Sequence, residues 1–127
     1  RHFADSDLAG DMVSVMRCRP DEIYREIPFT LAVPVLEIFP RAEHGLHDEP
    51  VMIQGMIDCW FIKDGELTLV DYKSDDIRGD DDDCAEILRH RYAGQLNWYA
   101  RAIEAAQKRP VTRRLIWHIR RGRAFMI

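Results

Sequence analysis

The sequence predicts one domain of mixed α and β structure (α/β, of the α+β kind), with a mixed β-sheet flanked by helices. We place this domain over residues 1–127. Two β-prone runs flank Asp64-Gly65, a pair that favours a two-residue hairpin turn. A long helical pattern over 84–108 and a further β-prone run over 112–119 follow. Because such a helix can serve as a crossover, the last core strand can run parallel to a hairpin strand.

The expected order of elements is α-β-β-β-α-β. Apolar residues at helical spacing predict a first helix from Phe3 to about Arg17. A strand is expected from Tyr24 to Val33, and its internal proline indicates an edge strand or a bulge. Residues 34–50 predict mostly loop, in which 35–39 can form a short strand.

The second half of the chain carries the hairpin, the long helix and the last strands. The hairpin strands are expected at about 51–62 and 66–73, followed by a loop over 74–83. Apolar residues three and four apart define the helix over 84–108, and Arg109-Pro110 ends it. A strand over 112–119 and the start of another at 124–127 complete the prediction.

The hairpin register places two carboxylates opposite each other. With the turn centred on Asp64-Gly65, opposed residues carry numbers that sum to 129, as Asp58 and Asp71 do. Directly opposed residues lie roughly 4.5–5.5 Å apart at Cβ. Lys73 lies two residues beyond Asp71, so its side chain is expected on the same face. Two acids and an ammonium group together indicate a hard-cation site beside a charge-stabilising lysine.

The neighbours in this register favour a metal over a solvated acidic pair. Both faces of the hairpin are largely apolar, as in strands that are covered on both sides. The expected pairs are Trp60–Leu69 and Ile62–Leu67 on the face of the acids, with Ile57–Tyr72, Cys59–Val70 and Phe61–Thr68 on the other. Two buried aspartates repel each other and resist ionisation unless a cation lies between them. A hairpin pair that the lysine merely neutralises stays open as the alternative.

Three other polar residues are candidates for the site. Gln95 and Tyr99 are four apart on the long helix, so they point the same way. They could hydrogen-bond a phosphate, a base or a water, or form an ordinary boundary of the core. Glu26 lies mid-strand among apolar neighbours, either as a salt-bridge partner or as a third acid near the metal. The five histidines show no metal-ligand spacing, and none is assigned a catalytic role.

Composition narrows the class of protein. The hydrophobic fraction of 46% and the charged fraction of 31% are typical of a globular domain, and no apolar run is long enough to span a membrane. The three cysteines form no CxxC pair and favour reduced thiols over zinc, iron–sulfur or disulfide sites.

Charge and chain ends add two expectations. Net charge is −4, but the C-terminal segment is strongly basic, and Arg113 and Arg114 within it could track phosphates or form a solvated face. The chain begins at Arg1 and ends on Phe125-Met126-Ile127 as a strand forms, so we expect a fragment of a longer polypeptide.

These motifs, in this order, resemble the RecB-type branch of the PD-(D/E)XK nucleases, whose pattern is GxxD, then DYK(S/T)D, then QLxxYA. The matching stretches are Gly55-Met56-Ile57-Asp58, Leu69-Val70-Asp71-Tyr72-Lys73-Ser74-Asp75 and Tyr92-Ala93-Gly94-Gln95-Leu96-Asn97-Trp98-Tyr99-Ala100. Upstream, Arg25-Glu26-Ile27-Pro28-Phe29 resembles the C-terminal nuclease domain of AddA-type helicase–nuclease subunits. The resemblance covers nearly the whole chain and implies a restriction-endonuclease-like core.

The resemblance also implies a role for each matching residue. Asp58, Asp71 and the backbone carbonyl of Tyr72 would bind Mg²⁺ or Mn²⁺, and Lys73 would orient or deprotonate the attacking water. Gln95 and Tyr99 would help to hold DNA and the lysine. Glu26 matches the acidic residue of the first core strand. The branch usually completes its metal shell with a histidine on an N-terminal helix, and because no such motif is found we expect that helix to precede this chain.

At the level of function, the resemblance implies a metal-dependent DNA exonuclease module of an ATP-dependent helicase–nuclease for double-strand-break repair and recombination. Its substrates would be linear duplex ends and unwound single strands, its partner would be of the AddB type, and its location would be the bacterial cytoplasm. The chain has no GxxxxGK[ST] motif, so the motor would lie elsewhere in the polypeptide. The alternatives are a non-catalytic DNA-binding or partner-docking module with the same fold, and a stand-alone exonuclease of the superfamily.

Overall fold

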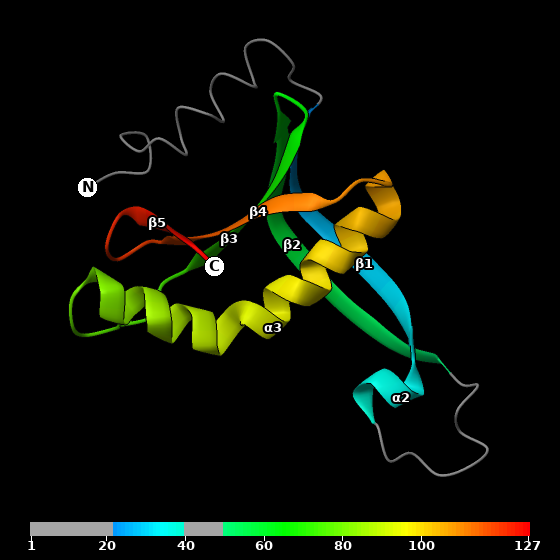
Figure 1. Ribbon diagram of the computed structural model, residues 1–127, viewed down its shortest axis with the longest axis horizontal. Helices are drawn as coiled ribbons and strands as arrows, with labels where there is room; N and C mark the ends of the chain where they lie inside the picture. Colours follow the sequence, from blue (N-terminus) through cyan, green and yellow to red (C-terminus); the bar gives the residue numbers. More distant parts are fainter. Residues whose placement is uncertain (1–21, 40–49) are drawn as a thin grey trace.

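The computed structural model describes residues 22–39 and 50–127, which form a five-stranded mixed sheet with a long helix across one face (Figure 1). The predicted helix over 3–17 lies outside the described residues. The strands are β1 (Ile23–Pro34), β2 (Pro50–Lys63), β3 (Glu66–Lys73), β4 (Val111–His118) and β5 (Arg123–Met126). Their order in the sheet is the order in the chain. The pairs β1–β2, β2–β3 and β4–β5 are antiparallel and β3–β4 is parallel, which confirms the predicted crossover.

The hairpin between β2 and β3 has the predicted register. Asp64 and Gly65 both have positive φ, 52° and 78°, as a type I′ turn requires. Pairing then runs from Lys63–Glu66 to Cys59–Val70. The turn therefore fixes which residues of β2 and β3 share a face.

Each face of the sheet carries its own apolar cluster. The helix-side core contains Trp60, Ile62, Leu67 and Leu69 from the hairpin, together with buried residues of the long helix. The opposite-face core is formed by Cys59, Phe61, Val70, Leu115 and Trp117. Burial on both faces explains why the hairpin strands are almost continuously apolar.

Two predicted strand pairs, Asp58 with Asp71 and Ile57 with Tyr72, are not formed, although the two aspartate side chains still contact each other. The pairing of β2 with β3 ends at Cys59–Val70, and Ile57 packs in the helix-side core instead. The ladder between β1 and β2 is interrupted at Glu26 of β1 and Asp58 of β2, and Glu26 adopts a φ of 51°. On each strand, the side chains before and after this point therefore do not continue one alternating pattern. Tyr24 and Ile27, only three residues apart, consequently both pack against the helix-side core.

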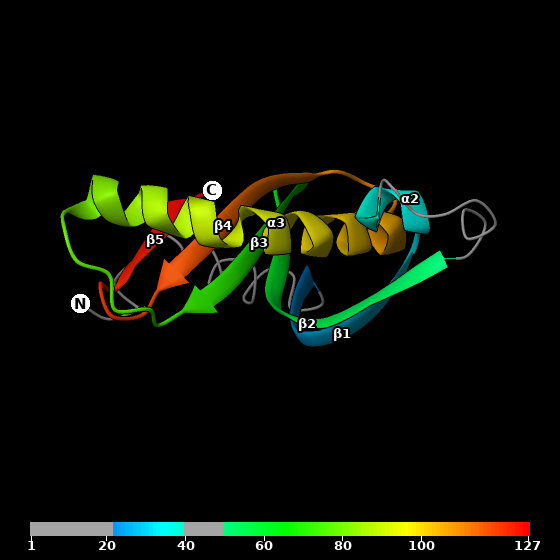
Figure 2. The same cartoon turned by 90° about the horizontal axis from the view of Figure 1, so that it is seen from below.

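The long helix α3 spans Asp81–Gln107 and crosses one face of the sheet (Figure 2). It begins three residues before the predicted start, because Asp80 and Asp83 form a capping box in which each side chain accepts a hydrogen bond from the other's backbone N–H. The acidic residues Asp81–Asp83 in the first turn face the positive end of the helix dipole. The helix thus starts inside the acidic run that predicted a loop.

A short helix, α2 (Val35–Ile38), stands where a short strand was expected. Pro34 precedes it with φ −59°, and Phe39 N–H donates to Val35 O at 2.7 Å, which closes the single turn. Glu37 forms an ion pair with Arg101 of α3, with 2.6 Å between Oε2 and Nη1. Val35 is buried, so the helical turn places an apolar side chain inward and Glu37 toward α3. Within the described residues, no helix has the length and apolar character needed to span a bilayer.

Gly55 lets the first two strands come close to α3. It pairs with Phe29, and a Cβ on Gly55 would lie 2.8 Å from Cε1 of that ring and 3.5 Å from Cε1 of Tyr99. The rings of Phe29 and Tyr99 pack edge to face, with 5.5 Å between centroids. The glycine therefore leaves room for an aromatic contact that ties β1 and β2 to the helix.

Replacing Gly55 by alanine should lower the free energy of unfolding by about 1–2 kcal/mol, because the added methyl group overpacks a ring that Tyr99 holds in place. Gly94→Ala is the matched control: no atom lies within 4 Å of its Cβ position, and alanine in a helix should stabilise by about 0.5–1 kcal/mol. Urea unfolding of both variants measures the two signs. Equal effects at both positions would contradict the close packing at Gly55.

Candidate active site

The two predicted aspartates lie where β2 and β3 separate. Beyond the last hairpin pair, Cys59–Val70, the Asp58 side chain takes the place of a ladder acceptor: its Oδ2 accepts a hydrogen bond from Tyr72 N–H at 2.8 Å. Asp71 is 2% exposed and Asp58 is half-buried. The Asp58 carboxylate therefore lies between the separating strands, and the Asp71 carboxylate lies beside it.

Burial shifts the acid–base behaviour of this pair. The pKa of Asp71 is raised to about 6, first because burial penalises its charged form and second because it contacts the Asp58 carboxyl. Lys73 opposes the shift. A carboxylate at this position therefore needs more positive charge than the lysine alone supplies.

Lys73 lies on the same face as Asp71, as predicted. Its Nζ is 2.9 Å from Asp71 Oδ2 and donates to Gln95 Oε1 at 2.9 Å. The same Nζ lies 4.3 Å from the centroid of the Tyr92 ring. A carboxylate, an amide oxygen and an aromatic face thus surround the ammonium group.

The oxygen atoms here fit a hard divalent cation. Asp71 Oδ2 is buried and accepts no hydrogen bond of good geometry within the described chain, although Lys73 lies beside it as an ion pair. The N–H and C=O of one residue in an extended strand point to the same side, so the Tyr72 carbonyl faces the edge of β3 where its N–H meets Asp58. Oxygen donors of these kinds suit Mg²⁺ and Mn²⁺. Residues 22–39 and 50–127 contain no cluster of three acidic, histidine or cysteine side chains suited to a metal.

Gln95 and Tyr99 both face the sheet from α3 but contact different partners. Gln95 is exposed and bonds Lys73, whereas Tyr99 is buried against Phe29. The pKa of Tyr99 is raised, mainly by burial and further by the charges of Asp71 and Asp58. Tyr99 therefore lies within the electrostatic field of the acidic pair, and Gln95 lies at its solvent side.

Glu26 is not brought into this group. It is exposed, and its left-handed backbone conformation marks the interruption of the β1–β2 ladder opposite Asp58. The described parts of the chain contain no cluster of three side chains suited to a metal. The structure therefore does not support Glu26 as a third acid near the metal.

The two candidate phosphate contacts lie on opposite faces of β4. Arg113 donates from Nε to Thr68 Oγ1 at 3.0 Å, whereas Arg114 reaches Asn97 of α3 with 3.4 Å between Nη1 and Oδ1. Only Arg114 therefore shares the helix side of the sheet with Asp71 and Lys73.

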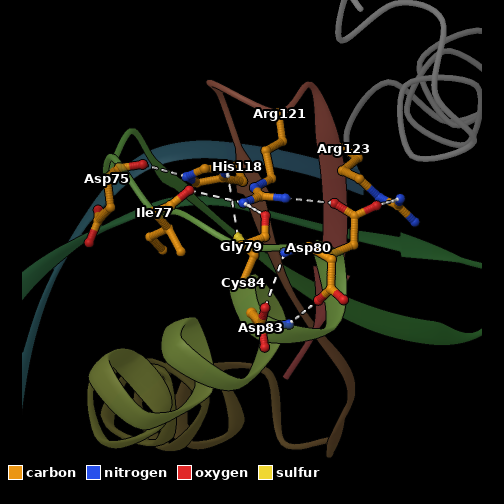
Figure 3. A network of polar contacts seen from close by, with 10 residues as sticks. Asp75, Ile77, Gly79, Asp80, Asp83, Cys84, His118, Arg121 and Arg123 are labelled. Carbon is orange, nitrogen blue, oxygen red and sulfur yellow. Dashed lines mark hydrogen bonds and ion pairs between the residues drawn. The ribbon is translucent and has the colours of Figure 1, made fainter.

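Two other arginines of the basic C-terminal segment, Arg121 and Arg123, contact the loop after Lys73 and the start of α3 (Figure 3). Arg121 donates to Ile77 O at 2.9 Å and to Gly79 O at 2.8 Å, and it also pairs with Asp81. Arg123 pairs with Asp81 as well. Much of this segment's charge is thus used within the structure, which its composition alone did not reveal.

Three contributors to the site escaped the sequence reasoning: Asp75, Tyr92 and His118. Asp75 accepts hydrogen bonds from Tyr92 and Arg91, and His118 is 1% exposed beside the backbone of Asp75. A signal was present for two of them. Asp75 ends the DYKSD stretch, and Tyr92 lies three residues before Gln95 on the same helical face.

The fold and this site together define a class: a mixed sheet with a helix across it, consistent with a restriction-endonuclease-like core. Comparison with known proteins gives the particular family. The AddA subunit of the ATP-dependent helicase/nuclease of Desulforudis audaxviator is 46% identical over 105 residues, or 83% of this chain and 8% of that protein. The protein of the same name from Heliobacterium modesticaldum is 41% identical over 104 residues (80% and 7%), and that from Bacillus licheniformis 34% over 128 residues (98% and 10%).

Over most of its length the chain is therefore a homologue of the AddA family of ATP-dependent helicase/nuclease subunits. It spans a tenth or less of the length of these relatives. No family model matches the chain.

The metal-free chain should lose stability as pH rises from about 4 to about 6. Unfolded Asp71 ionises near pH 3.9 and folded Asp71 near 6, so between these values the folded state binds more protons. Asp71→Asn removes this contribution. The variant's free energy of unfolding minus that of the parent should grow with pH by up to about 3 kcal/mol.

Urea unfolding in a chelator across pH 4–7.5 measures this difference. Comparing the two proteins cancels other titrating groups such as Asp75, whose pKa is lowered, mainly by the Tyr92 hydroxyl. A difference in the free energy of unfolding that stays constant or shrinks as pH rises would contradict the raised pKa of Asp71.

Proposed function

We propose that this chain is a metal-dependent DNA nuclease module that hydrolyses phosphodiester bonds as an exonuclease. The observation that carries the proposal is the buried Asp71 oxygen without a hydrogen bond, next to Asp58 and Lys73, where β2 and β3 separate. A structural ion pair would need only one acid for one lysine. The second carboxylate and the buried Asp71 oxygen together offer donors that suit a divalent cation.

Asp58, Asp71 and the carbonyl of Tyr72 would hold Mg²⁺ or Mn²⁺. When bound, the ion supplies Lewis-acid chemistry: it polarises a phosphate oxygen and lowers the pKa of water. The chain's own contribution is to present the ligands from two strands whose positions are fixed by the hairpin turn and by the Tyr72–Asp58 hydrogen bond.

Lys73 would offset the charge that develops on the phosphate during hydrolysis and orient the attacking water. Its ammonium group has three donors; Gln95 accepts a hydrogen bond from one of them, and Asp71 lies beside the group as an ion pair. Its side chain is 18% exposed, so it borders solvent from which DNA can approach. Preorganised charge of this kind needs no rearrangement at the moment of reaction.

For the whole protein we propose the setting that its relatives' names describe, one component of an ATP-dependent helicase/nuclease. The module would then act on linear duplex ends and unwound strands during double-strand-break repair and recombination, in the bacterial cytoplasm, with an AddB-type partner. The ATP-driven motor would lie elsewhere in the longer polypeptide.

Lys73→Ala should lower cleavage of linear DNA in Mn²⁺ by at least about 100-fold, as the loss of one preorganised transition-state donor does elsewhere. Fold and most metal binding should persist, because Lys73 is not a metal ligand. Lys63→Ala, at the turn end of the same hairpin, is the matched control and should cleave like the parent.

A fluorescent end-labelled duplex measures the cleavage rate. Equal cleavage by parent and Lys73→Ala would remove Lys73 from the mechanism. A parent that binds DNA but never cleaves it, with binding unchanged by Asp58→Asn and Asp71→Asn, would instead favour a DNA-docking module.

A further inference from the structure

Lys73, Ser74 and Asp75 follow Asp71 and Tyr72 in the chain. Hydrogen bonds from the end of β4 and the two residues after it hold their backbone in place. The carbonyls of Lys73, Ser74 and Asp75 each meet a group of the segment 118–120. Ile119 N–H donates to Lys73 O at 2.8 Å, and Arg120 Nε donates to Ser74 O at 2.6 Å. Nε2 of buried His118 lies 2.7 Å from Asp75 O, and because a carbonyl only accepts, this nitrogen carries the proton. The chain therefore leaves β3 in a defined direction, and the position of Asp75 is set.

The Asp75 carboxylate reaches α3. Its Oδ2 accepts a hydrogen bond from the Tyr92 hydroxyl at 2.6 Å and another from Arg91 Nη1 at 2.9 Å. The first distance is typical of a charge-assisted hydrogen bond. The same contact lowers the pKa of Asp75 and raises that of Tyr92. One end of the Tyr92 ring is thus fixed by a charged group outside the apolar core.

The face of that ring lies against the lysine of the site. Lys73 Nζ is 4.3 Å from the ring centroid, within the range of a cation–π contact. Tyr92 and Gln95 are three residues apart on α3, so the helix presents the ring and the amide oxygen together. Asp71 approaches the same ammonium group from β3.

We propose that Tyr92, with its ring fixed by Asp75, is a positioning residue that holds the Lys73 ammonium group between Asp71 and Gln95. The consequence for catalysis rests on the proposed nuclease function. The placement itself rests only on the contacts around Nζ and on the Asp75–Tyr92 hydrogen bond. The ammonium group of Lys73 is carried by a flexible four-carbon stem. Without the Tyr92 ring, one side of this ammonium group would lose its contact.

The chain allows a direct measurement of this contact, because it contains three lysines: Lys63, Lys73 and Lys108. Labelling with ¹³C-lysine gives three ε-methylene signals by NMR. Protons held over an aromatic face are shifted upfield by the ring current, so the Lys73 signal should lie upfield of the other two. Lys73→Ala assigns it.

The variants then separate the ring from its hydroxyl. Tyr92→Leu should return the Lys73 signal to the position of an exposed lysine, and Tyr92→Phe, which keeps the ring but loses its hydrogen bond to Asp75, should give an intermediate displacement. Asp75→Asn should reduce it, since the ring loses its charged acceptor. Trp98→Leu is the matched control: Trp98 lies on the same helix under Arg101, 4.9 Å from its guanidinium carbon, and its loss should leave the Lys73 signal unchanged.

The cleavage assay adds the functional consequence. Tyr92→Leu should lower kcat by about 3–30-fold, the range of a cation–π contact, with KM for DNA nearly unchanged. Tyr92→Phe should lower kcat less than Tyr92→Leu does, because it keeps the ring and loses only the hydrogen bond to Asp75. Equal lowering of kcat by leucine and phenylalanine would overturn the role of the ring.

The NMR outcomes stand apart from the nuclease proposal. A Lys73 signal that Tyr92→Leu does not move would overturn the inference, whatever the activity. A displacement unchanged by Asp75→Asn would overturn the part given to Asp75. A displaced signal in a chain that cleaves no DNA would support the placement of Lys73 while the proposed function fails.

Discussion

The site depends on one hydrogen bond, from Tyr72 N–H to the Asp58 carboxylate, at the point where two paired strands separate. Up to Cys59–Val70, β2 pairs with β3; beyond it, β2 continues with β1 and β3 with β4. A simple separation would leave backbone groups unpaired, which is costly when they are buried. The Asp58 side chain fills this need on one side. It thereby gives a carboxylate a fixed position where the two strands separate.

Two carboxylates, Asp58 and Asp71, meet where the strands separate. Although Lys73 forms an ion pair with Asp71, burial raises the pKa of Asp71 to about 6. A buried acid usually resolves such a conflict by taking a proton or a partner. Under the proposed function, a divalent cation would take the place of the proton at neutral pH and would bind the buried Asp71 oxygen.

The sequence predicted the hairpin, and two acids near its far end, because one local signal, Asp64-Gly65, sets the register of the two strands as far as Cys59–Val70. The sequence did not predict that the pairing of β2 with β3 ends at Cys59, because β2 continues there only with β1, a strand from a distant part of the chain. Ile57 was misplaced because the β1–β2 ladder is interrupted at Glu26 and Asp58, which the sequence pattern does not reveal. The contact of Asp75 with Tyr92 joins residues 17 apart, and no local pattern encodes it.

The central claim is that Asp58 and Asp71 form a metal site, and a calorimetric titration of Mn²⁺ tests it most directly. The parent chain should bind, and the Asp58→Asn/Asp71→Asn double variant should not. The control is the double variant Asp64→Asn/Glu66→Gln, which makes the same change of charge at the turn end of the hairpin and should bind Mn²⁺ like the parent. Asparagine is compatible with the positive φ at position 64. Absence of binding by the parent, or equal binding by the double variant, would contradict the account.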